Sequence, residues 1–153
     1  MRILPAAAIL VWLGIMAFFA GVVAPAAFSA LDREAAGRFV SAVFPRYYVV
    51  GAVLGALALA GLGLRFALGP RRPWDGLPLL LVAVMLATTL YAWLVVLPAA
   101  HAAREALRQS VPVPGAVSTE ALAFARLHRL SGLLNGAAMV AGVLALAAVG
   151  LRR

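Results

Sequence analysis

Charged residues divide the chain into four long apolar stretches. Residues 3–31, 47–64, 76–100 and 130–151 contain no charged side chain and are 18 to 29 residues long. About 20 apolar residues form a helix that crosses a hydrocarbon core about 30 Å thick. The alternating pattern of a membrane β-barrel is missing, and backbone groups in lipid must pair within their own segment. The pattern therefore predicts an all-α protein, a four-helix transmembrane bundle.

The segments that flank the apolar stretches predict further helical turns. From residue 31 to residue 43 an apolar residue recurs every fourth position, opposite charged residues such as Arg38. This period predicts a short amphipathic helix lying at the membrane surface between helices one and two, ended by Pro45. Good helix formers continue the third helix past Pro98 to Gln109, and the residues from Ser118 onward can cap the fourth helix.

The second half of the chain resembles the first. Residues 23–28 (Val-Ala-Pro-Ala-Ala-Phe) recur as residues 96–101 (Val-Leu-Pro-Ala-Ala-His). Three glycines also recur 81 positions later; they are Gly51, Gly55 and Gly61, matched by Gly132, Gly136 and Gly142. We therefore expect one integral membrane domain over residues 1–153, built from two tandem helical hairpins at approximately 1–68 and 76–153. Since both copies would start from the same side, the axis that relates them would follow the membrane normal.

Composition supports a membrane location and restricts the partners. The apolar fraction of 65% exceeds what a soluble domain of this size could bury. A net charge of +8 would suggest nucleic acid for a soluble protein, but these arginines flank the spans, so anionic membrane lipids are the expected partners and nucleic acid is not. The chain contains arginine and no lysine, which suggests a GC-rich bacterial genome and hence a location in the bacterial cytoplasmic membrane. Both termini are expected to lie on the cytoplasmic side.

Three stretches combine spaced aromatic, proline and polar residues. They are Trp12 with Gly21-x-Val23-Ala24-Pro25-x-x-Phe28, Ala36-Gly37 and Phe44-Pro45-x-Tyr47-Tyr48; Leu86-Ala87-Thr88 leading through Trp93 to Pro98; and Phe124-x-x-Leu127-His128-x-x-Ser131-x-x-Leu134-Asn135. In this order they resemble the transmembrane-protein-205-like family, small polytopic proteins carried as a domain of unknown function. The resemblance implies four helices and a membrane location, and it implies no established biochemical activity.

Polar residues of the fourth stretch share one helical face. His128, Ser131 and Asn135 are spaced by three and four residues, which places them on one side of a helix. Serine and asparagine there can bond to a neighbouring helix, contributing on the order of 0.6 kcal/mol each. Thr88 and Tyr91 are the candidate opposing groups. The leading interpretation is a non-enzymatic protein that acts through helix packing, lipid contact or interaction, without a cofactor.

Two other interpretations use the same polar residues. Polar groups inside a membrane often mark a pathway, so the protein could be a channel or transport component for a small solute. No carboxylate lies in any of the four stretches, which argues against a proton-coupled or sodium-coupled carrier. Alternatively, His101 and His128 could ligate haem or copper from two helices. The chain contains no glycine-rich phosphate loop and no histidine and glutamate zinc motif.

The remaining candidate residues are interpreted as structural. Charged residues near the spans are expected to form interfacial ion pairs, which contribute little stability when exposed; they are Asp32, Glu34, Arg104, Glu105 and Arg126. Small residues allow close helix contact, and the candidates are Gly14, Gly21, Gly51, Gly55, Gly132 and Gly136. Some of these glycines could mediate a homo-oligomer. Because the polar residues are confined to the second copy, we expect the functional site in the second hairpin.

Overall fold

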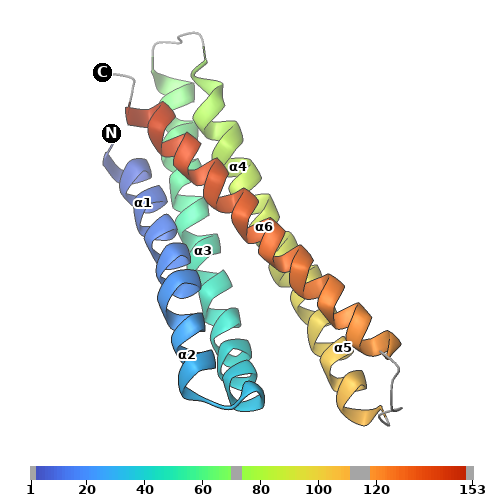
Figure 1. The fold of residues 1–153 in the computed structure, drawn as a ribbon. Helices are drawn as coiled ribbons and strands as arrows, with labels where there is room; N and C mark the ends of the chain where they lie inside the picture. The colour runs from blue at the N-terminus through green and yellow to red at the C-terminus, as the bar shows by residue number, and fades with distance from the viewer. Residues whose placement is uncertain (1–2, 70–73, 111–117, 151–153) are drawn as a thin grey trace.

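The computed structural model describes residues 3–69, 74–110 and 118–150. Within them, four long helical segments lie side by side (Figure 1). The segments are α1 (Ile3–Phe18), η1 (Phe19–Val23) and α2 (Ala24–Ala30); α3 (Arg33–Leu68); α4 (Gly76–Tyr91), η2 (Ala92–Val96) and α5 (Leu97–Gln109); and α6 (Thr119–Gly150). Their lengths of 28, 36, 34 and 32 residues and their hydropathy suffice to cross a membrane. The predicted all-α four-helix membrane bundle is confirmed.

The predicted short surface helix between the first two spans is wrong. Only a tight turn at Leu31 and Asp32 separates α2 from α3, and residues 33–43 are the first turns of α3 itself. Asp32 caps this helix, because its Oδ1 accepts hydrogen bonds from the backbone N–H of Glu34 at 3.0 Å and of Ala35 at 2.8 Å. Amphipathic spacing is the same in a separate helix and in the end of a longer one, so the pattern could not place the boundary.

Pro45 lies inside α3 and does not begin a new helix. A proline removes one backbone donor and crowds the preceding turn, but membrane helices tolerate this where side chains satisfy the freed groups. The Arg46 guanidinium donates to the carbonyl of Ala42 at 3.3 Å, within this turn. The helical continuation to Gln109 is confirmed, and Ser118 Oγ accepts from the N–H of Ala121 at 3.1 Å at the start of α6.

The first and third spans each contain a π-helical turn directly before a proline. In η1 and η2, the residue just before Pro25 or Pro98 donates its N–H to the carbonyl five positions back. A wider turn provides room for a proline ring that lacks a donor. The two turns occupy matching positions in the proposed repeat, although the repeat itself stays a prediction.

The packed core occupies the half of the bundle where α1 begins and α6 ends. There α1 packs on α3 and α6, and α4 packs on the same two helices. The fully buried side chains include Ile9, Trp12 and Met16 of α1 and Met85 of α4. Toward the other end the pairs α2–α3 and α5–α6 part from each other, as Figure 1 shows. We call these the packed half and the parted half.

Glycines of α3 make the packed half possible. A Cβ atom at Gly51 would lie 2.7 Å from Nε1 of Trp12, and one at Gly55 would lie 2.8 Å from its Cζ3. Both distances are shorter than side-chain atoms tolerate, so the indole fits only because these positions have no side chain. Trp12 is 1% exposed as a result.

Candidate functional site

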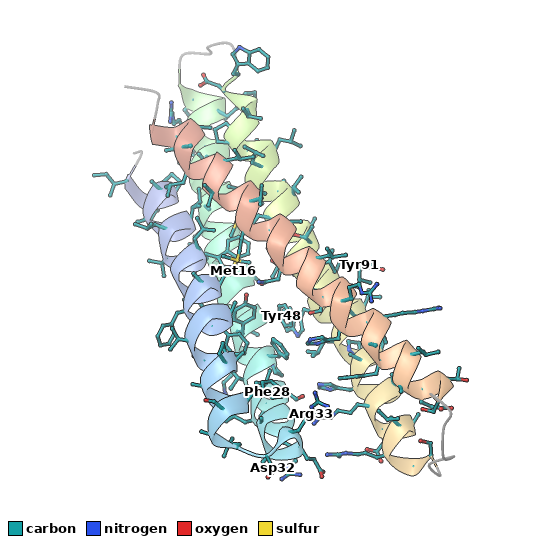
Figure 2. All side chains as sticks on the ribbon, viewed as in Figure 1. Met16, Phe28, Asp32, Arg33, Tyr48 and Tyr91 are labelled. Atoms are coloured by element: carbon teal, nitrogen blue, oxygen red, sulfur yellow. The ribbon has the colours of Figure 1, made fainter. Side chains whose placement is uncertain are left out.

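The polar face of α6 meets two tyrosines of α3 where the packed half ends. Tyr47 donates its phenolic hydrogen to Oδ1 of Asn135 at 2.8 Å, and the amide nitrogen of Asn135 donates to Sδ of Met139 at 3.7 Å. Ser131 and Tyr48 share a side-chain hydrogen bond, and Tyr48 lies between α3 and α6 in Figure 2. These contacts join α3 to α6, so Ser131 and Asn135 serve helix packing.

An aromatic cluster surrounds the two tyrosines. Phe19 of η1 stands 5.4 Å from Phe44 and 5.2 Å from Tyr47, measured between ring centroids. Tyr48 is 5.8 Å from Phe44 and 5.3 Å from Tyr47. These residues were not predicted to be partners of the polar face. One feature of the sequence pointed to them: a phenol in a charge-free stretch needs a hydrogen-bond partner when it is buried.

Thr88 and Tyr91 were the candidate partners of the polar face, and the hydrogen bonds of Thr88 lie within its own helix. The Thr88 hydroxyl lies 2.9 Å from the carbonyl oxygen of Val84 and 3.0 Å from that of Met85, both in its own helix. Tyr91 is 48% exposed, and Figure 2 shows it away from the space that holds Tyr48. A threonine in a helix can donate its hydroxyl hydrogen to a carbonyl of the preceding turn, so it does not need a partner on another helix.

The two histidines have different surroundings. His128 is exposed and stacks on Phe124 of its own helix, with ring centroids 6.2 Å apart. His101 lines a groove between α3 and α5. No hydrogen bond or ring contact joins the two imidazoles in the part of the chain that the structure describes. Across residues 3–69, 74–110 and 118–150, no three histidine or acidic side chains gather as metal ligands.

The groove lies in the parted half and is lined by polar and charged residues. Its volume is about 260 Å³, and side chains of α3 and α5 face each other across it. The lining residues are Arg38, Ser41, His101, Arg104, Glu105 and Arg108. The charged residues of two distant segments thus share one surface.

Glu34 is the carboxylate that connects the two helix pairs. Its Oε1 accepts from Arg38 at 2.8 Å and from Arg108 of α5 at 2.7 Å. Glu105 lies 3.8 Å from Arg108. All four of these side chains are more than one third exposed, so solvent screens the pairs and each contributes little stability.

Arg104 makes a different kind of contact. Its guanidinium donates to Oγ of Ser41 at 3.2 Å and to the backbone carbonyl of Glu34 at 3.4 Å, and both acceptors are uncharged. The side chain lies over Gly37, where an added Cβ atom would overlap the guanidinium. Gly37 therefore provides the space that lets Arg104 reach across from α5 to α3.

Asp32 and Arg126 do not form ion pairs in the described part of the chain. Asp32 acts as a helix cap. The hydrogen bond from the backbone N–H of Ala35 lowers the pKa of its carboxyl, burial raises it, and the hydrogen bond from the N–H of Glu34 lowers it. The pKa therefore lies below the usual value of 3.8. Arg126 is exposed on α6.

The six candidate packing glycines fall into two groups. Gly51 and Gly55 contact Trp12, as described above. An added Cβ would meet no other atom within 4 Å at the remaining four positions, which are Gly14, Gly21, Gly132 and Gly136. Those four positions are open within one chain.

A family model described as a domain of unknown function (DUF4149) matches residues 7–109. The match covers the first two of the three resembling stretches, including Trp12, both prolines that follow π-helical turns, and the groove. No curated protein and no solved structure matches the chain. Because the family model covers about two thirds of the sequence, this four-span membrane protein belongs to the DUF4149 family, whose function is unknown.

Proposed function

We propose that this protein is a non-enzymatic membrane protein that binds lipid between the pairs α2–α3 and α5–α6, at the opening formed by the groove that residues of α3 and α5 line. The observation that carries the proposal is this groove at the end where the charge-free stretches stop, with α2 packed on α3 and α5 packed on α6. On this side the four stretches stop at Leu31, Tyr47, Ala100 and Leu130, so the opening faces lipid headgroups and the upper parts of their chains. Burial is sparse there, and α5 has no buried residue.

The surfaces beside the opening suit a lipid. Apolar side chains such as Phe28 and Phe39 are about half exposed on α2 and α3, at 51% and 46%. Basic side chains lie close by on α3, with Arg33 just after the end of α2 and Arg38 directly before Phe39. An apolar surface next to arginines matches the chemistry of a phospholipid, whose chains are apolar and whose headgroup is polar.

Photo-crosslinking of the full chain in vesicles tests this role. Vesicles of phosphatidylethanolamine and phosphatidylglycerol would contain a phospholipid with a diazirine near the glycerol end of one chain, and adducts would be mapped by peptide mass spectrometry. We expect adducts to concentrate several-fold on α2, α5 and the first turns of α3 and α6, relative to headgroup-level residues at the packed half. Equal labelling at both ends would show only the lipid layer that surrounds any membrane protein and would contradict the proposal.

A further inference from the structure

We propose that the groove between α3 and α5 binds the phosphate of an anionic lipid headgroup, and that Arg104 is its main ligand. This inference rests on the proposed lipid-binding role and names the chemistry that the site recognises. It depends on the surroundings of one guanidinium, on the charge of the groove and on its height in the membrane.

Among the residues that the structure describes, Arg104 is the arginine of the groove without a carboxylate partner. Arg38 and Arg108 both donate to Glu34, whereas Arg104 donates to a hydroxyl and a backbone carbonyl. An arginine has five N–H donors, so donors remain after these two bonds. A half-buried guanidinium held by neutral acceptors gains most from a charged acceptor. Phosphate oxygens fit its planar fork well.

The charge balance of the groove favours a monoanion. Three arginines stand against Glu34 and Glu105, which leaves one positive charge when His101 is neutral. A phosphodiester such as that of phosphatidylglycerol carries one negative charge. The volume of about 260 Å³ accommodates a headgroup phosphate with its glycerol, and an open groove lets the chains remain in the bilayer.

The height of the groove matches the headgroup layer. His101 directly follows the uncharged stretch that ends at Ala100, and Arg104 lies four residues beyond that end. At 1.5 Å per helical residue, Arg104 is about 6 Å past the hydrocarbon edge. Ser41 precedes Tyr47 by six residues, or about 9 Å. Headgroup layers extend roughly 5 to 8 Å beyond the hydrocarbon core on each side, so Arg104 lies at the level of lipid phosphates when the edge is measured from the second and third stretches.

The Arg104 side chain is already held in place before a ligand binds. Gly37 leaves space for the arginine chain, and Ser41 orients one end of its guanidinium. Ordering a long side chain in advance lowers the entropic cost of binding. Gly37 and Ser41 are thus positioning residues, and Arg104 is the residue that would contact the phosphate.

Native mass spectrometry of the full chain in mild detergent tests the assignment. Dioleoylphosphatidylglycerol would be titrated into the unmodified protein, Arg104→Gln, Arg104→Lys and the control Arg126→Gln. Arg126 lies on the same side of the membrane, and its exchange removes the same charge. We expect about tenfold weaker binding for Arg104→Gln, as for the loss of a charged hydrogen bond. Arg104→Lys should bind with an intermediate affinity, because it retains charge but loses the fork, and Arg126→Gln should change affinity less than twofold.

Two further arms separate lipid from free phosphate. Dioleoylphosphatidylcholine, whose choline neutralises the headgroup, should bind the unmodified protein several-fold more weakly than the phosphatidylglycerol. Inorganic phosphate in large molar excess should leave phosphatidylglycerol bound. Displacement by inorganic phosphate, or equal loss in Arg104→Gln and Arg126→Gln, would overturn the proposal.

The photo-crosslinking result keeps the two proposals distinguishable. If adducts concentrate at the opening while Arg104→Gln binds phosphatidylglycerol normally, lipid binding stands and the phosphate assignment fails. If Arg104→Gln does not fold, the comparison of Arg104→Lys with Arg126→Gln replaces it, and equal affinities for these two would overturn the assignment.

Discussion

The packed half and the parted half of this bundle are held together by different forces. In the packed half, Trp12 fits against Gly51 and Gly55, and Ile9, Met16 and Met85 are fully or almost fully buried. In the parted half, α2 packs on α3 and α5 packs on α6, and polar side chains bridge the two pairs. Lipid provides no hydrophobic force between helices, so shape complementarity decides where they pack closely.

This difference explains where a functional surface can exist. The Trp12 half is closely packed, whereas the groove lies in the parted half, where Arg104 and Arg108 bridge α5 to α3. Exposed ion pairs contribute little stability, so we expect stability to depend on the packed half, while the proposed ligand site lies in the parted half. Three substitutions and a change of pH test this division, in order of decreasing expected effect.

Trp12→Ala should destabilise the protein most. Removing a buried indole leaves a cavity and costs about 3 kcal/mol or more, because Trp12 is 1% exposed. Unfolding by sodium dodecyl sulfate in mixed micelles measures the loss. Phe18→Ala is the control, since Phe18 is 61% exposed on the same helix, and its effect should stay within about 0.5 kcal/mol. Equal losses would show that the packed half is not defined by Trp12.

Gly55→Ala should destabilise by about 1 to 3 kcal/mol, because the new methyl group would press on Trp12 and overpack the core. Gly136→Ala is the matched control from the second sequence copy, where the added methyl meets nothing within 4 Å. It should be neutral or stabilising by up to about 1 kcal/mol, since alanine favours helices. The same unfolding assay measures both; a comparable loss in Gly136→Ala would place a partner against that face of α6.

Tyr47→Phe should have a smaller effect at the boundary of the two halves. It removes the hydrogen bond to Asn135 and keeps the ring in the aromatic cluster, so we expect a loss of about 0.6 kcal/mol. A double-mutant cycle with Asn135→Leu isolates the pair. Strict additivity of the two single changes would refute a direct bond between α3 and α6.

Acidification should have the smallest effect, and its action on the Asp32 cap can be followed at the start of α3. Hydrogen bonds from Ala35 and Glu34 keep the pKa of Asp32 below 3.8. Its stabilising contribution is therefore present above that usual value and is lost as the pH falls through the lowered folded-state value. Amide hydrogen exchange at Ala35 should accelerate over that range after correction for intrinsic rates. Asp32→Asn retains a cap without a titrating group and should remove the pH dependence; acceleration that persists in this variant would assign it to another group.

Sequence patterns predicted the spans better than their junctions. Four uncharged stretches correspond to four helical segments, because hydrocarbon allows a spanning chain few structures other than a helix. The surface helix was wrong because its spacing is equally that of the first turns of α3, and because Pro45 is accommodated inside the helix. Neither feature depends on local sequence alone.

The candidate site shows the same limit. The sequence placed His128, Ser131 and Asn135 on one face of α6 by their spacing, which helical geometry imposes without any partner. Which residues meet that face depended on the packing of α3, and the structure brings Tyr47 and Tyr48 there while Thr88 bonds within α4. The groove combines Arg38 and Arg104 from segments more than sixty residues apart.

For this protein, the sequence by itself determined the membrane location and the number and faces of the helices, since these follow from local apolarity and from the helical period. The tertiary structure alone decided that the helices pack at one end and part at the other. That outcome depends on whether Trp12 finds glycines on a neighbouring helix and whether Arg104 finds space at Gly37. Such contacts join distant segments, and no local period encodes them.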